Sequence, residues 1–163
     1  MSRGFLLDTN VPSELTRPQP DARVAQWLED RDDDLMHISV ITIGEVCKGI
    51  TVHPDPHRRA WLRQWLENEL RPWFAGRILP VTEAISERWG ILEGDCQLKG
   101  IGFNAPDGLI AATALEHDLT LRYAQRERLR RPRRCGVQPV GYSVAPAGVS
   151  LRREIFRLPP RLL

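Results

Sequence analysis

The chain has 163 residues, of which 42% are hydrophobic, 27% charged and 7% aromatic, a composition typical of a globular protein rather than of a disordered or fibrous one. Its apolar runs fall far short of the ~20 residues of a membrane-spanning helix, so we expect no transmembrane segment and no secretory signal. Three cysteines, an odd number without metal-ligand spacing, argue against a disulfide framework or a zinc ribbon. We therefore expect free thiols and a cytoplasmic protein.

The small net charge of +2 conceals an uneven distribution. Residues 122–163 hold eleven arginines against two glutamates, a net charge of +9, so residues 1–121 carry −7. The regular hydrophobic pattern also ends at this point. We predict a folded domain over residues 1–121 and a divergent, Arg-rich tail over residues 122–163. Clustered like charge favours a solvated or disordered tail, and a basic arm that binds RNA phosphates is the alternative.

Along the first 121 residues, short apolar runs alternate with segments of helical periodicity. The apolar runs predict strands at residues 5–7, 35–38, 78–81 and 119–121. Capping or helix-starting residues predict helices that begin close to Pro12, Asp21, Ser39, Pro56, Thr82 and Pro106. Strands separated by helices indicate an α/β fold of three layers, with a central parallel sheet flanked by helices. Trp61 and Trp65 form an aromatic stripe that is typical of a core or of a dimer surface.

Three carboxylates stand at positions that such a sheet brings to one edge. Asp8 ends the first strand, Glu45 lies near the start of the helix after the second strand, and Asp107 lies in the first turn of the helix before the fourth. Like charges held close together need a counter-charge, and oxygen ligands without His or Cys favour Mg²⁺ or Mn²⁺ over zinc. Such a site suits phosphodiester hydrolysis by activated water.

Each carboxylate also has a structural explanation. Asp8 can cap the following helix, with Thr9 and Asn10 as hydrogen-bonding neighbours, and Asp107 can interact with its helix dipole. Glu45 lies within an apolar helical surface, where a carboxylate is costly unless it binds a metal or pairs with a cation such as Arg59 or Arg63. A phosphatase with Asp8 as nucleophile ranks last, because Asn10 stands where a second aspartate is needed.

Four segments together resemble the PIN-domain ribonuclease toxins of VapC type, in particular their FitB-like branch. The segments are Leu6-Leu7-Asp8-Thr9-Asn10, residues 38–45, residues 77–81 and residues 107–114, and the resemblance covers about residues 4–121 in order. It implies a PIN fold and a Mg²⁺- or Mn²⁺-dependent endoribonuclease that cleaves RNA as the toxin of a type II toxin–antitoxin system. It also implies a VapB-type antitoxin partner and a homodimer. Asp8, Glu45 and Asp107 match the first three family acids as catalytic residues and metal ligands, with Asp8 and Asp107 the better ligand candidates.

The resemblance breaks after Leu121. There the family continues Val-Thr-Arg-Asn, followed by Asp-Phe, which supplies a fourth acid and the last strand, whereas this chain reads Arg-Tyr-Ala-Gln. We hypothesise a one-nucleotide frameshift, because codons exist for residues 122–130 that spell Val-Thr-Arg-Asn-Val-Ser-Asp-Phe when their first base is dropped. Loss of the fourth acid predicts impaired activity and an unpaired sheet edge. The alternative is a catalytically inactive PIN module that binds antitoxin or RNA without cleavage.

Overall fold

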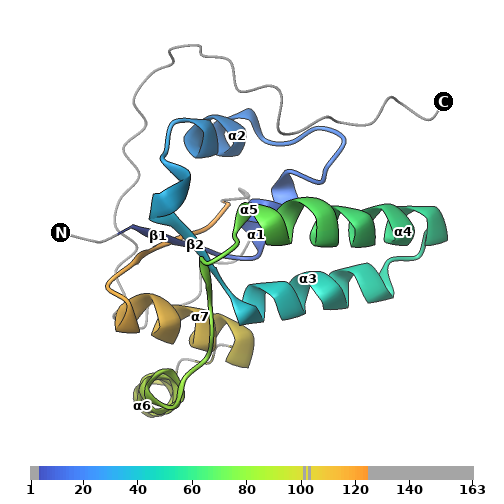
Figure 1. The fold of residues 1–163 in the computed structure, drawn as a ribbon. Helices are drawn as coiled ribbons and strands as arrows, with labels where there is room; N and C mark the ends of the chain where they lie inside the picture. The colour runs from blue at the N-terminus through green and yellow to red at the C-terminus, as the bar shows by residue number, and fades with distance from the viewer. Residues whose placement is uncertain (1–3, 101, 103, 125–163) are drawn as a thin grey trace.

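A parallel sheet occupies the centre of the protein (Figure 1). The computed structural model describes residues 4–100, 102 and 104–124. Within them, the strands are β1 (Phe5–Leu7), β2 (Met36–Ser39), β3 (Ile78–Leu79) and β4 (Thr120–Arg122), in the order β3-β2-β1-β4. All pairings among these strands are parallel. Because parallel neighbours need crossover connections, helices link them. The predicted α/β fold with a central parallel sheet is confirmed.

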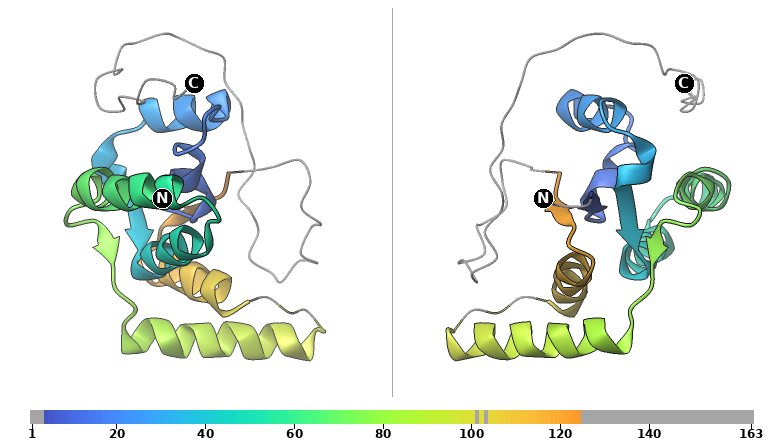
Figure 2. Two further views of the ribbon diagram at one scale, coloured as in Figure 1. Left: turned by 90° about the vertical axis from the view of Figure 1, so that its right-hand side faces the viewer. Right: turned by 60° about the vertical axis from the view of Figure 1, so that its left-hand side comes forward.

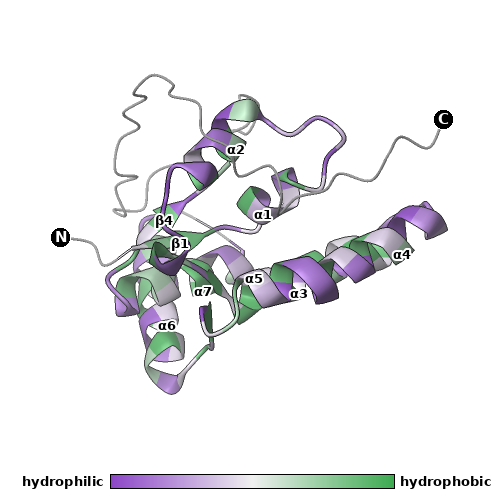
Figure 3. Cartoon of the chain, turned by 45° about the horizontal axis from the view of Figure 1, so that its top comes forward, coloured by the Kyte–Doolittle hydropathy of each residue, from purple (hydrophilic) through white to green (hydrophobic). Residues whose placement is uncertain are grey.

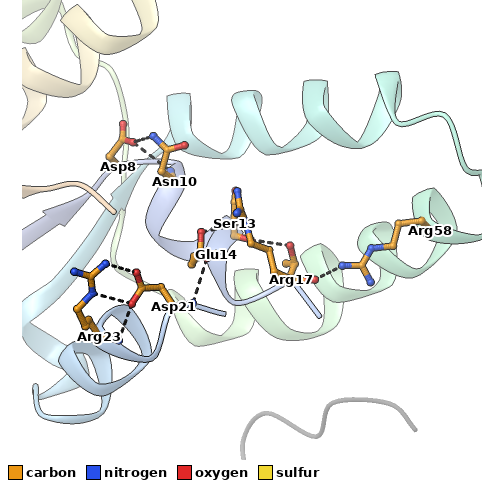
Figure 4. Close-up of polar contacts among 9 residues, drawn as sticks. Asp8, Asn10, Ser13, Glu14, Arg17, Asp21, Arg23 and Arg58 are labelled. Carbon is orange, nitrogen blue, oxygen red and sulfur yellow. Dashed lines mark hydrogen bonds and ion pairs between the residues drawn. The ribbon is translucent and has the colours of Figure 1, made fainter. Parts of the chain in front are cut away.

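Two short helices and a tight turn connect β1 to β2. They are α1 (Asn10–Glu14), α2 (Ala22–Glu29) and η1 (Asp33–Leu35), the last a turn of 3₁₀ helix. Asp21 caps α2 as predicted, because its carboxylate accepts a hydrogen bond from the backbone N–H of Arg23 at 2.9 Å. The buried carboxylate of Glu14 accepts from the backbone N–H of Asp21 at 3.2 Å and pairs with Arg17 at 3.1 Å (Figure 4). Glu14 thus fixes α1 to the start of α2.

A pair of long helical segments follows β2 and extends to one side of the sheet (Figure 1). The segments are α3 (Val40–Val52) and a continuous run made of α4 (Pro56–Trp65), the π turn η2 (Leu66–Leu70) and α5 (Arg71–Trp73). The hydroxyl of Ser39 caps α3 as predicted, accepting from the N–H of Ile41 at 3.2 Å. Trp65 is only 4% exposed, so the core explanation of the aromatic stripe is correct for this residue.

The opposite side of the sheet carries two helices in succession. α7 (Ala105–Glu116) packs against β1 and β4, and α6 (Glu83–Leu98) packs on α7 as the outermost layer (Figure 2). Thr82 caps α6 as predicted, its hydroxyl accepting from the N–H of Ile85 at 3.3 Å. α7 therefore lies between the sheet and α6, and its small apolar residues Ile110, Ala112 and Ala114 are buried.

The two faces of β1 point into separate parts of the core. Leu7 packs with side chains of α1, α2, α3 and η2, whereas Leu6 packs with Ile110 and Ala114 of α7. This follows from the two-residue period of a strand. Figure 3 shows apolar residues concentrated on the sheet and on the helix surfaces that face it. Each fully buried Leu contributes about 1.5–3 kcal/mol relative to an exposed position.

Several expectations need correction or fall outside the described part of the chain. β3 ends at Leu79 rather than at residue 81, and β4 extends to Arg122, one residue past the predicted domain boundary. Cys47 is free, but Cys96 is disulfide-bonded, so the expectation of free thiols is wrong for Cys96. The predicted Arg-rich tail lies outside the described residues from residue 125 on. No helix among the described residues has the length and hydrophobicity needed to cross a bilayer.

Candidate acidic active site

The carboxyl edge of the sheet places the three predicted acids on different elements. Asp8 directly follows β1, Glu45 lies in the second turn of α3, and Asp107 lies in the first turn of α7. Asp8 follows Leu6 by two residues, so it continues the face of β1 that points toward α7. The sheet thus directs Asp8 to the side on which Asp107 is found.

Asp8 is a buried carboxylate, with 4% of its surface exposed. Its Oδ2 accepts hydrogen bonds from the Nδ2 of Asn10 at 2.7 Å and from the backbone N–H of Asn10 at 3.2 Å (Figure 4). The predicted hydrogen bonding of Asn10 to Asp8 is confirmed. The bond from the backbone N–H of Asn10 also satisfies a donor at the start of α1. The Thr9 hydroxyl is buried without a hydrogen-bond partner, so the predicted support from Thr9 comes from its backbone, whose hydrogen bond to Asp8 lowers the pKa of that carboxyl.

The backbone around Asp8 is fixed on both sides. Its N–H donates to the carbonyl of Arg122 at 2.8 Å, and its carbonyl accepts from the N–H of Val11 at 2.9 Å. The first bond extends the β1–β4 ladder by one position, and the second starts the helical turn. Asp8 is therefore held at the junction of strand and helix, where its carboxylate has little freedom to move away from the sheet edge.

Asp107 is an exposed carboxylate that is held by the residue that caps its helix. The side chain of Asn104 accepts from the backbone N–H of Asp107 at 3.0 Å, and its Nδ2 donates to Oδ2 of the Asp107 carboxylate at 3.0 Å. The predicted interaction with the helix terminus is therefore present, and it coexists with a position close to Asp8. An asparagine side chain thus orients each of the two aspartates.

Glu45 differs from its expected environment. We expected a carboxylate enclosed by apolar residues, but its side chain is 33% exposed because α3 presents this turn partly to solvent. It pairs with Lys48 on the next turn, Nζ to Oε1 at 3.6 Å, and not with Arg59 or Arg63. The desolvation argument for a metal at Glu45 is therefore wrong. An exposed pair at this spacing stabilises a helix by only about 0.3–0.5 kcal/mol.

The electrostatics of the acids show which of them lie near one another. Burial raises the pKa of Asp8, the hydrogen bonds from Asn10 oppose this, and the charge of Asp107 raises the pKa further. Partial desolvation of the exposed Asp107 carboxyl raises its pKa as well, and the charge of Glu45 adds to this rise. Asp107 is thus coupled to both other acids. Among the described residues, no three Asp, Glu, His or Cys side chains form a group that could hold a metal ion as they stand.

Neither aspartate has a positively charged partner within the described residues, whose ion pairs involve other carboxylates. A buried carboxylate without a counter-charge is costly, and its neighbour of like charge adds to the cost. Two neighbouring carboxylates match the ligands that Mg²⁺ uses together with waters and substrate phosphates. The donor set therefore fits a hard divalent cation.

One residue at this edge, Tyr123, was not predicted from the sequence. It directly follows β4. Burial raises the pKa of its phenol to about 12, and the charges of Asp8 and Asp107 contribute to this rise. The phenol is therefore close to both acids. The signal that could have found it is the register of the sheet, because the residue after β4 falls beside the residue after β1.

Comparison with known proteins gives relatives over most of the chain. The chain is 39% identical over 117 residues to "Toxin FitB" of Neisseria gonorrhoeae, a match that covers 72% of this chain and 84% of the relative. It is 36% identical over 113 residues to "VapC ribonuclease Y4jK" of Sinorhizobium fredii, covering 69% of this chain and 81% of the relative.

Solved structures agree with these relatives. The crystal structure of FitAcB from Neisseria gonorrhoeae matches with a TM-score of 0.68 and 38% identity over 72% of this chain and 84% of the other. A toxin–antitoxin complex from Klebsiella pneumoniae matches with a TM-score of 0.52 and 27% identity, over 72% and 83% of the two chains. The PIN-domain family model matches residues 5–132. The acids at the sheet edge, the four-stranded order and these matches agree: the chain belongs to the PIN-domain family.

Proposed function

We propose that this protein is a divalent-metal-dependent endoribonuclease and the toxin of a type II toxin–antitoxin pair, acting in the cytoplasm. The observation that carries the proposal is the buried, unneutralised carboxylate of Asp8 beside Asp107 at the carboxyl edge of the sheet. Membership of the PIN family and the relative named a VapC ribonuclease support RNA as the substrate.

Asp8 and Asp107 are the residues that would hold Mg²⁺ or Mn²⁺, with Glu45 as a third acid near Asp107. A cation held by these carboxylates would supply charge neutralisation for the phosphodiester and activation of a water for attack. Asn10 and Asn104 orient the two aspartates, so that the ligand oxygens are positioned before the cation arrives. Without a cation, the repulsion among these acids opposes the approach of an RNA phosphate, which makes the dependence on metal strong.

The test is cleavage of a structured RNA by the purified chain, with Mg²⁺ or Mn²⁺ and with a chelator. We expect cleavage only with the metal, and loss of cleavage by about 10³-fold or more in Asp8→Asn and Asp107→Asn, because positioned charge stabilisation is worth several kcal/mol of barrier. Asp34→Asn is the matched control, since this exposed aspartate lies before β2, at the other end of the strand.

Two results would contradict the proposal. Cleavage that persists in Asp8→Asn would assign the activity to a contaminant or to another site. RNA binding without any cleavage, in the presence of either metal, would instead support the inactive PIN module that binds antitoxin or RNA.

The antitoxin partner is a second part of the proposal. The solved relative from Klebsiella pneumoniae is a toxin–antitoxin complex, and it has the same fold at 27% identity. We propose that a VapB-type antitoxin covers the acids of this chain. Co-expression with its VapB-type antitoxin should yield a stable complex in which cleavage is suppressed, and failure of the two proteins to co-purify would count against the proposal. A homodimer remains a prediction from the resemblance.

A further inference from the structure

Tyr123 lies beside the acids because of the register between β1 and β4. Leu7 is opposite Arg122 in the parallel ladder, and the N–H of Asp8 donates to the carbonyl of Arg122 at 2.8 Å. The next position along each chain therefore sets Asp8 and Tyr123 side by side. Leu121 packs on the α7 side of the sheet, and Tyr123, two residues on, continues that face.

Tyr123 is both near the acids and partly exposed. Tyr123 keeps 45% of its surface exposed, although burial and the charges of Asp8 and Asp107 act on its hydroxyl. The side chain thus lies near the acidic site and stays partly accessible to solvent. A tyrosine phenol is neutral at physiological pH, because its ordinary pKa of about 10 lies well above that range.

An uncharged aromatic ring can supply a contact to RNA that the acidic side chains of this site cannot make. The acids repel a phosphate backbone, so contacts that do not depend on positive charge are needed to hold RNA at the cleavage position. Proteins bind single-stranded RNA largely by stacking unpaired bases on aromatic side chains, and any base can stack. An aromatic ring that continues from the sheet edge next to the acids is placed to receive the base that neighbours the reacting phosphate.

We propose that Tyr123 is a substrate-positioning residue on which a nucleobase next to the scissile phosphate of single-stranded RNA stacks. This inference rests on the proposed ribonuclease function and deepens it. It assigns to Tyr123 a role in substrate affinity, and not in the chemical step, which the acids perform.

The first experiment separates affinity from catalysis. In full-length protein, Tyr123→Ala should raise KM for a single-stranded RNA oligonucleotide by about 5- to 100-fold, the usual effect of losing one stacked base, with kcat changed less than threefold. Tyr123→Phe and Tyr123→Trp should stay close to the unsubstituted chain, since both keep a ring. Val52→Ala, which removes an apolar group that is 72% exposed at the far end of α3, is the matched control.

The second experiment identifies the stacked base. Binding is measured by fluorescence anisotropy in the Asp107→Asn background, with RNAs that carry one abasic nucleotide on either side of the cleaved bond. One abasic position should weaken binding as much as Tyr123→Ala does, and the two changes together should add nothing further. Unchanged melting temperatures and divalent-ion affinities of the Tyr123 variants establish that fold and metal site are intact.

Three outcomes would overturn the inference: equal KM for Tyr123→Ala and the unsubstituted chain, additive effects of the abasic nucleotide and Tyr123→Ala, or a Tyr123→Phe variant as weak as Tyr123→Ala. The last would assign the contact to the hydroxyl. A chain that binds RNA through Tyr123 but never cleaves it would refute the proposed ribonuclease activity and leave the stacking role standing.

Discussion

Asp8 illustrates how a single residue can be costly for folding and useful for function. Its pKa in the folded chain lies above the ordinary value of 3.8, because of burial and the charge of Asp107. Between the two values the folded chain binds more protons than the unfolded chain, so stability falls as pH rises through this window. Above the pKa of Asp8 in the folded chain, the ionised carboxylate destabilises the fold to its full extent. The metal-free protein is therefore stabilised by acidification toward this window, until other groups dominate.

Asp8→Asn should remove this cost. We expect the metal-free variant to melt at a higher temperature than the unsubstituted chain at pH 7, by roughly 2–4 °C for each ~1 kcal/mol of repulsion relieved. Its melting temperature should also depend less on pH as the pH rises from the ordinary carboxyl pKa of 3.8 through the raised pKa of Asp8. Thermal unfolding followed by circular dichroism, with a chelator present, measures both effects. A variant that melts below the unsubstituted chain at every pH would show that the charge of Asp8 stabilises the fold.

Glu45 differs from Asp8, because its carboxylate is partly exposed and paired, so we expect its removal to change stability little. Glu45→Gln should lose only the weak pair with Lys48, about 0.3–0.5 kcal/mol, and keep its fold. Its affinity for Mn²⁺, measured by calorimetry, should fall by about tenfold if Glu45 contributes to the metal site together with Asp107. Lys48→Gln breaks the same pair without removing the carboxylate and should leave Mn²⁺ affinity within twofold. Equal losses in the two variants would assign the effect to the pair itself.

At the scale of secondary-structure elements, local capping was predictable from sequence and the exact extent of elements was not. Asp21, Ser39 and Thr82 cap the helices expected of them, because a side-chain oxygen and a free backbone N–H two or three residues on suffice for this interaction. The π turn at residues 66–70 was not predicted, since its extra residue per turn leaves no distinct local pattern. β3 is short because pairing with β2, and not its own propensity, sets its length.

The same distinction applies to the site. The topology of alternating strands and helices was enough to bring Asp8 and Asp107 to one edge. The predicted burial of Glu45 was wrong, because apolar residues all round a helix do not show which of its turns a neighbouring element covers. Tyr123 was missed because its place depends on pairing between strands more than a hundred residues apart. Local pattern finds the acids, whereas side-chain environments require the tertiary structure.

The cap of α7 offers a prediction at this scale. Asn104→Ala should lose both hydrogen bonds to Asp107 and destabilise the protein by about 1 kcal/mol. It should also raise the pKa of the Asp107 carboxyl, because the hydrogen bond from the Asn104 side chain lowers that pKa. Metal affinity should therefore fall, most clearly at low pH where protons compete. Asn104→Asp restores an acceptor for the backbone N–H but adds a negative charge beside Asp107. Chemical denaturation and calorimetry at two pH values distinguish these effects, and unchanged stability of Asn104→Ala would contradict the capping role.

For the whole molecule, the hypothesis of a one-nucleotide frameshift near Leu121 predicts what the ancestral continuation would do. Replacing residues 122–129 by Val-Thr-Arg-Asn-Val-Ser-Asp-Phe restores the family acid that the chain lacks, and exchanges Tyr123 for threonine. Because added carboxylate charge improves cation binding, we expect tighter Mn²⁺ binding and a kcat at least tenfold higher. Because the ring is lost, KM should rise as it does in Tyr123→Ala.

The two effects are separable, since one acts on kcat and metal affinity and the other on KM. An exchange in which the new aspartate is replaced by asparagine is the matched control: it should keep the raised KM and lose the gain in kcat. If both exchanged chains bind Mn²⁺ no better than the original, residues 122–129 do not descend from a fourth acidic motif. The nucleotide sequence provides the independent check, because the frameshift requires that dropping one base near the codon of Leu121 spell the family motif in the actual gene.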